Sequence, residues 1–250
     1  LQGSVFYTMN AFIEPLVDLH GWSRAGIGLS MTFASAMMTL SMPIGIMLTN
    51  KVSIRLLMTL GAFIGGLGYI GLGHVDDIRL FAALFSIVWV CGQICGGAVA
   101  PMLMNRWLAA CRGRALGLVA IGTSLSGAFL PFIALVLVDT FGVSWAFSVL
   151  GGLAFLLFPI CWRLIRDTPE ELGLTVDGLA AGAFQPGAEE GKVVPIGWRE
   201  LIRGRRMWII GVSFGIGLMA VGGVLSQLKP RFVDSGMGSY AAMGFMCLTA

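Results

Sequence analysis

The sequence has few charged residues and therefore little of the surface chemistry that a water-soluble protein needs. Charged side chains make up 12% of its 250 residues, hydrophobic ones make up 57%, and the mean hydropathy is +0.88. A soluble domain usually carries about 25% charged residues. A surface this poor in charge cannot face water everywhere, so the composition excludes an ordinary soluble fold and indicates that lipid covers much of the protein.

The sequence also lacks the patterns of a disulfide framework, a metal centre or a membrane enzyme. Cys91 and Cys95 are one helical turn apart, which would suit a metal pair, but small packing residues in a helix are the favoured interpretation. No histidine stands at zinc-ligand spacing from them. No paired carboxylates and no nucleophile with a nearby base fall in the apolar segments. We therefore expect no metal, no cofactor and no enzymatic activity.

Long apolar runs dominate the chain, and a helix needs about 20 apolar residues to cross a bilayer. The sequence therefore predicts an all-α polytopic membrane protein. It starts already apolar at Leu1 and ends inside an apolar run, so we interpret it as part of a longer chain with a truncated first span. The expected spans lie at 1–17, 25–48, 56–73, 80–103, 115–138, 145–164 and 207–228, and an eighth begins near Tyr240.

A polar stretch divides the chain into three regions. We predict an N-terminal bundle of six transmembrane helices over 1–165, a cytoplasmic linker over 166–206, and over 207–250 the start of a second bundle, with helix seven and the beginning of helix eight. The linker ends in the basic segment "GWRELIRGRRMW", which also reads as a nucleic-acid patch. Its Trp198 and Trp208 favour an amphipathic helix at the membrane surface instead.

Basic residues follow alternate spans. Twelve of the 16 Lys and Arg residues fall after spans two, four and six, whereas Asp18, Asp76, Asp77 and Asp139 fall in the other connections. Because basic residues mark the cytoplasmic side, we expect the 2–3, 4–5 and 6–7 loops in the cytoplasm.

The expected spans contain almost no charge, so neutral polar groups are the candidates for a substrate cavity. Gln93 lies near the middle of the fourth span, one turn after Trp89, and an amide can both donate and accept hydrogen bonds. An equally good interpretation is that Gln93 ties two helices together. Thr123 and Ser126 lie in the fifth span, where hydroxyls often bond back to their own helix. Asn10 is the candidate in the first span.

Glu14, near the outer end of the first span, is either an interfacial residue or a proton carrier, and the interfacial interpretation is favoured. No Lys or Arg lies deep in any complete span. A carboxylate substrate would therefore need neutral donors here, or a cationic partner from sequence outside these spans.

Four local motifs, "HGWSRAGIGLS", "NRWLAACRGRALGLVAIGTSLSG", "DTPEELGLTVDG" and "QLKPRFVDSGMGSYAA", resemble the major facilitator superfamily in its monocarboxylate-porter-like and oxalate:formate-antiporter-like branch. The resemblance implies two six-helix halves, a substrate held between them near the membrane midplane, and alternating access. The positive partner of an anion would then lie in span eight or at the start of span one.

One loop departs from the pattern of that superfamily. The usual loop after span two reads G-x3-D-R-x-G-x-R, and here the stretch is "GIMLTNKVSIR", with Asn50 in place of the acid and Ser53 in place of the glycine. The resemblance gives that acid a part in locking the cytoplasmic gate. Our hypothesis is that Asn50 weakens the outward-facing state and that Asn50→Asp slows inward opening. The expected gate and loop residues are Gly45, Asn50, Lys51, Arg55, Arg106, Arg112 and Arg114.

These observations favour a secondary active transporter of a small organic anion of the monocarboxylate type, working as a symporter with a proton or as an antiporter. A transporter of drugs or sugars is the alternative, and a transporter-like membrane sensor is a weaker one. The expected partners are the lipid bilayer, the anion and a proton, with no nucleic acid. We expect the protein in the inner (plasma) membrane of a bacterium.

Overall fold

The computed structural model describes residues 2–108, 111–174 and 176, together with 204–205, 208–209, 211–213, 215–217, 219–220, 231–232 and 244. Every element assigned within these residues is a helix. Much of the seventh expected span, nearly all of the eighth and most of the expected linker lie outside the described residues. The helices are α1 (Gln2–His20), α2 (Arg24–Leu48), α3 (Ile54–Leu72), α4 (Ile78–Gly92), the π-helix η1 (Gln93–Ala98), α5 (Val99–Trp107), α6 (Arg112–Phe141), α7 (Val143–Leu164) and the 3₁₀-helix η2 (Pro169–Leu172).

These helices match the first six expected spans, with α4, η1 and α5 forming one continuous span. Among the described residues, five helices are long and apolar enough to cross a membrane. The polar residues Asn10, Glu14 and Asp18 lower the hydropathy of α1 and keep it out of this set. The five are Arg24–Leu48, Ile54–Leu72, Ile78–Trp107, Gly113–Phe141 and Val143–Leu164.

Short polar side chains fix where several helices begin. The hydroxyl of Ser23 accepts the amide of Gly26 at 3.0 Å, and the hydroxyl of Ser53 accepts the amide of Leu56 at 3.1 Å. Each satisfies a donor that the first helical turn leaves unpaired. Gly142, with φ of 84°, separates α6 from α7 because this left-handed backbone conformation suits glycine.

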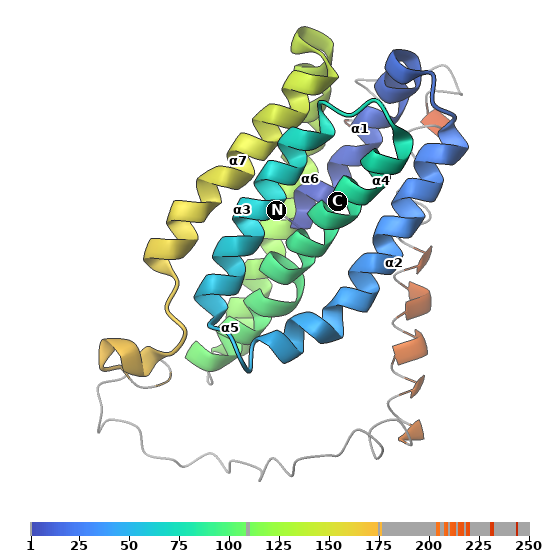
Figure 1. Cartoon of the computed structure of the whole chain (residues 1–250). Coiled ribbons are helices and arrows are strands. Elements are labelled where there is room, and N and C mark those ends of the chain that lie inside the picture. Colours follow the sequence, from blue (N-terminus) through green and yellow to red (C-terminus); the bar gives the residue numbers. More distant parts are fainter. Residues whose placement is uncertain are drawn as a thin grey trace.

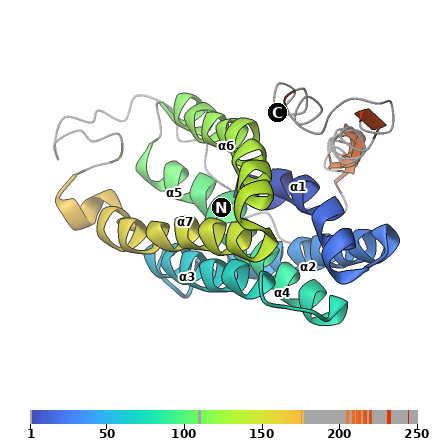
Figure 2. The ribbon, with the colours of Figure 1, turned by 90° about the horizontal axis from the view of Figure 1, so that it is seen from above.

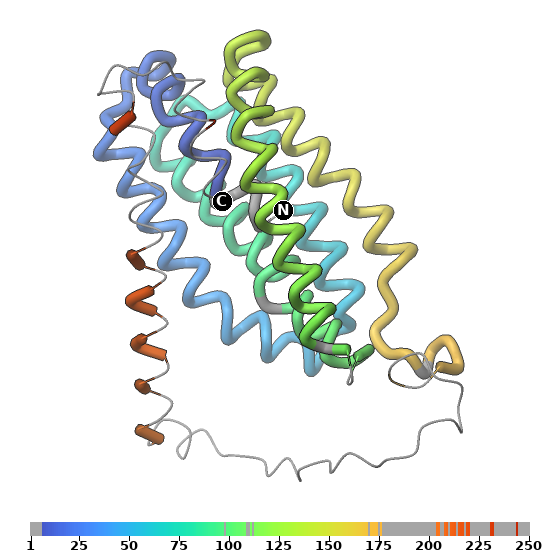
Figure 3. The backbone as a smooth tube through the Cα atoms, turned by 180° about the vertical axis from the view of Figure 1, so that it is seen from behind, coloured from blue at the N-terminus to red at the C-terminus, as the bar shows by residue number. Residues whose placement is uncertain are grey.

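The helices form one bundle in which successive spans run in opposite directions (Figure 1). α3 packs against α7 and α4, α4 packs against α2, and α1 packs against α6 (Figure 2). The α2–α3 loop, the α5–α6 loop and the segment after α7 consequently lie at the same end (Figure 3). We call it the basic end, since it carries Lys51, Arg106, Arg114, Arg163 and Arg166.

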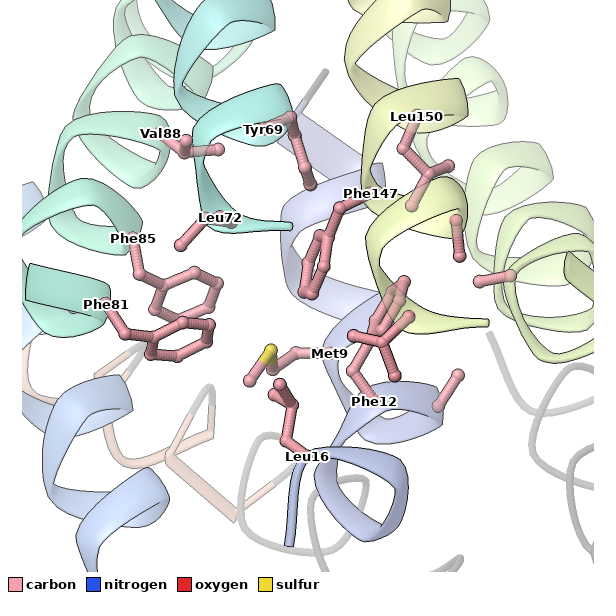
Figure 4. Close-up of a cluster of buried hydrophobic side chains, with 14 of the residues drawn as sticks. Met9, Phe12, Leu16, Tyr69, Leu72, Phe81, Phe85, Val88, Phe147 and Leu150 are labelled. Carbon is pink, nitrogen blue, oxygen red and sulfur yellow. The ribbon is translucent and has the colours of Figure 1, made fainter. Parts of the chain in front are cut away.

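The main hydrophobic cluster fills the half of the bundle away from the basic end. Aromatic rings and Met9 from α1, α3, α4 and α7 point toward one another there (Figure 4). Phe12 of α1 stacks on Phe147 of α7, with ring centroids 4.0 Å apart. A second, smaller cluster at the basic end contains Ile54, Val99 and Leu103. The two clusters share no buried residue.

Glycines let α3 and α7 cross closely. A Cβ at Gly151 would lie 2.7 Å from the carbonyl oxygen of Gly66, and one at Gly66 would lie 3.1 Å from that of Gly151. The backbones therefore touch without side chains between them, as small residues allow in membrane helices. By contrast, a Cβ at Gly117 or Gly122 of α6 would meet nothing within 4 Å among the described residues, so these glycines have no packing partner in this bundle.

Candidate functional site

The candidate site centres on the fourth span, where the α-helix changes to a π-helix. Gln93 is the first residue of η1, and Trp89 lies one turn before it on α4. Both side chains are 7% exposed. Single π-turns inside α-helices are rare and are often found at functional sites, because the extra residue redirects the side chains around it. The structure thus brings Trp89 and Gln93 together, as the spacing predicts.

A column of aromatic side chains leads along α4 to Gln93. The Phe81 and Phe85 rings are 5.7 Å apart between centroids, and the Phe85 and Trp89 rings are 5.6 Å apart. Trp22 lies edge-on to Phe81 at 5.2 Å. The spacing of four residues places these rings and Gln93 on one face of the helix. The amide of Gln93 thus lies at the end of a row of aromatic side chains on α4.

Gly97 provides the space in which the Gln93 amide lies. A Cβ at position 97 would overlap the Cδ, Oε1 and Nε2 atoms of Gln93. The amide therefore folds over the backbone of the next helical turn, and only glycine at 97 permits this position.

Asn10 lies on α1, which contacts both α4 and η1. Its side chain is 6% exposed, between the core residues Met9 and Ala11. The two buried amides, on α1 and on η1, therefore belong to neighbouring elements. Burying a polar side chain such as an amide is costly unless it is hydrogen-bonded.

Thr123 and Ser126 are half-buried on α6. The hydroxyl of Ser126 donates to the carbonyl oxygen of Thr123 at 2.7 Å, which is the bond back to its own helix that the alternative interpretation describes. The role of Thr123 and Ser126 in a cavity stays a prediction.

Glu14 lies six residues before the end of α1. Its Oε1 is 3.9 Å from Nη2 of Arg24, and its side chain is 33% exposed. The pair joins α1 to the start of α2 at the end of the bundle opposite the basic end. This partner fits an interfacial position better than a proton carrier inside the bundle.

Among the expected gate residues, Gly45 is buried, whereas Asn50 and Lys51 are exposed in the α2–α3 loop. Arg55 lies in the first turn of α3, and its guanidinium carbon is 4.3 Å from the centre of the Trp162 ring. This is a cation–π contact. The Nε atom of Arg55 is buried and has no hydrogen-bond partner within the described part of the chain.

Two further contacts close the basic end. Nη2 of Arg106 donates to the carbonyl oxygen of Thr49 at 3.4 Å, and Nε1 of Trp107 donates to that of Arg166 at 3.0 Å. Arg114 is exposed. The side chain of Arg112, another expected gate residue, is outside the described set.

Sequence reasoning missed Asp167 and Trp162. Oδ1 of Asp167 accepts the backbone amide of Arg55 at 2.8 Å, although the two residues are 112 positions apart. No local motif signals a pairing at that distance, because it depends on how α3 and α7 pack. Within the described residues, no group of three or more His, Cys, Asp or Glu side chains is placed to hold a metal ion.

Comparison with known proteins yields one family. The family model described as Major Facilitator Superfamily matches residues 1–250. No curated protein matches the chain at a significant level.

Proposed function

Since the chain belongs to the Major Facilitator Superfamily, whose members are transporters and not enzymes, we propose that it is a secondary active transporter of a small organic anion. The anion is of the monocarboxylate type, and it moves by alternating access with a proton or in exchange for another anion. The protein is an integral membrane protein with multiple spans, in contact with lipid.

The observation that carries the proposal is the buried amide of Gln93 at the π-turn of the fourth span. It is buried one turn from Trp89 and lies over Gly97. A preformed polar group in an otherwise apolar setting is what a small-molecule site needs for orientation and specificity. The amide N–H groups suit a carboxylate oxygen, and the carbonyl suits a hydroxyl.

The remaining charge of an anion requires a cation elsewhere. The described spans carry their Lys and Arg residues near helix ends, such as Arg24, Arg55 and Arg106. A charge in the membrane interior is costly and is therefore kept for function. We propose that the cationic partner belongs to the second half of the transporter, and that residues 207–250 begin that half.

We further propose that the basic end faces the cytoplasm. The α2–α3 and α5–α6 loops and the segment after α7 lie together there with their basic residues, as the positive-inside rule requires. The division into a bundle over 1–165, a linker over 166–206 and a second bundle from 207 belongs to the same proposal, as does a bacterial inner membrane.

The direct test is flux into proteoliposomes made with the complete protein. We expect saturable uptake of labelled lactate or formate, driven by a pH gradient or by the same anion inside. Glucose and a lipophilic cation serve as controls. Saturable flux of either control, with none of the carboxylates, would favour the sugar or drug alternative. Tight substrate binding without flux would indicate a sensor.

Substitution of the two buried amides tests their part in the site. We expect Gln93→Ala and Asn10→Ala each to raise the apparent KM about tenfold or more, since a hydrogen bond to a charged group is worth about 1.5–3 kcal/mol. The amount of protein inserted in the membrane should be unchanged. Ser148→Ala is the matched control, because its hydroxyl donates to the carbonyl of Ser144 on its own helix. A parental KM in both amide variants would remove them from the site.

A further inference from the structure

The α2–α3 loop, residues 49–53, carries no acidic side chain. The first turn of α3 nevertheless needs acceptors for its amides, since no residue of that helix can pair them. Ser53 supplies one, for Leu56 at 3.1 Å. The other comes from outside the loop: Oδ1 of Asp167, in the segment after α7, accepts the amide of Arg55 at 2.8 Å. A carboxylate at a helix N-terminus also interacts favourably with the helix dipole.

Neighbouring contacts hold the segment after α7 in the same place. Trp162 on the last turn of α7 stacks under the Arg55 guanidinium at 4.3 Å. The carbonyl of Arg166 accepts Nε1 of Trp107 at 3.0 Å, and Ile165 packs against the smaller hydrophobic cluster. The polypeptide is therefore fixed directly before Asp167, by contacts that do not depend on its carboxylate.

The other side of the loop is held by the fourth span. Arg106 donates to the carbonyl of Thr49, and the Thr49 hydroxyl lies 3.8 Å from the sulfur of Met102. Thr49 is 5% exposed as a result, although the adjoining Asn50 and Lys51 are exposed. The loop is thus clamped between α5 and the segment that leaves α7.

We propose that Asp167 is a positioning residue for the α2–α3 loop, capping α3 from the start of the linker and so coupling the linker to the loop. A displacement of the linker then frees the first turn of α3 and loosens the clamp on Thr49. The anchoring of the α2–α3 loop by Asp167 does not depend on any substrate. Its part in the conformational cycle rests on the proposed transport function.

The test uses Thr49→Cys in the full-length protein with the native cysteines replaced, purified in detergent. The rate of labelling by a water-soluble maleimide reports how often the clamp opens. Loss of a capping acceptor destabilises the first turn of the helix, so the clamp should open more often. We therefore expect labelling about fivefold faster in Asp167→Ala. Asp167→Asn and Asp167→Ser, which keep an acceptor, should stay within about twofold of the parent.

Glu171→Ala is the matched control. It removes the same charge from an exposed position in the same segment. The proposal is overturned if Asp167→Ala labels at the parental rate, if Asp167→Asn labels as fast as Asp167→Ala, or if Glu171→Ala gives the same acceleration. Asp167→Leu, also without an acceptor, replaces Asp167→Ala if the latter is not recovered as a monodisperse protein.

A second readout separates anchoring from transport. In proteoliposomes, Asp167→Ala should change the maximal rate of uptake severalfold and leave KM within about twofold, because the residue lies outside the candidate cavity. A changed KM at an unchanged maximal rate would contradict the role in the cycle. If no flux is found at all, the labelling result still decides the anchoring, so failure of one proposal is distinguishable from failure of the other.

Discussion

At the scale of single residues, Gly97 offers a way to move the Gln93 amide without removing it. A methyl group at 97 would meet only the end of the flexible Gln93 side chain, which can rotate away. We therefore expect Gly97→Ala to leave the protein stable and to raise the apparent KM, approaching the effect of Gln93→Ala. Uptake kinetics and thermal stability, measured on the same preparation, check both halves of this prediction.

The control for Gly97→Ala is Gly122→Ala on α6, where an added methyl would meet nothing within 4 Å. Its KM and thermal stability should match those of the parent. A parental KM in Gly97→Ala would mean that the position of the Gln93 amide does not matter for uptake.

The sequence allowed prediction of some candidate residues but not of others. Trp89 and Gln93 share a helical face because of their spacing alone, and the structure places both side chains in the interior. The contact between Asp167 and Arg55 could not be predicted, because it joins residues 112 positions apart through the packing of two helices. Spacing along one helix is local information, whereas a capping partner from another segment is not.

At the scale of helices, the crossing of α3 and α7 should be the most sensitive point of the described bundle to added volume. A methyl group at Gly151 would press against the Gly66 carbonyl and the Ile70 amide, at 2.7 and 3.0 Å. Backbone atoms cannot move aside as a side-chain tip can, so we expect Gly151→Ala to cost about 1–3 kcal/mol. A lower melting temperature in detergent would be the observable.

The adjacent residue supplies the comparison. A methyl group at Gly152 would meet nothing within 4 Å, and alanine favours a helix over glycine by about 1 kcal/mol. Gly152→Ala should therefore melt at the parental temperature or slightly above it. Equal melting temperatures for the two variants would show that the close crossing contributes little to stability.

The approximate positions of the five described membrane-spanning helices followed from hydrophobic length, because a bilayer-spanning run is long and has few charges to interrupt it. The π-turn did not. An extra residue per turn leaves no trace in a segment where residues on every side are apolar or small, as in "CGQICGGAVA".

At the scale of the whole molecule, the distribution of basic residues predicts an orientation that can be tested without any substrate. We expect an epitope tag placed in the stretch 166–206 of the complete protein to be reached by antibody only after the cells are permeabilised. A tag in the α3–α4 connection, beside Asp76, should be reached once the outer membrane is removed, while the inner membrane is still intact. The reverse pattern would overturn the proposed sidedness, and with it the cytoplasmic location of the α2–α3 loop.

The existence of two separate hydrophobic clusters has a mechanical consequence. Ile54, Val99 and Leu103 hold the basic end together without sharing a buried side chain with the larger cluster around Phe12 and Phe147. Tension applied through the peptide after α7 would act first on the smaller group, which has fewer contacts to lose. Pulled from the end of α7, the bundle should yield in stages, with the basic end giving way while the larger cluster still holds.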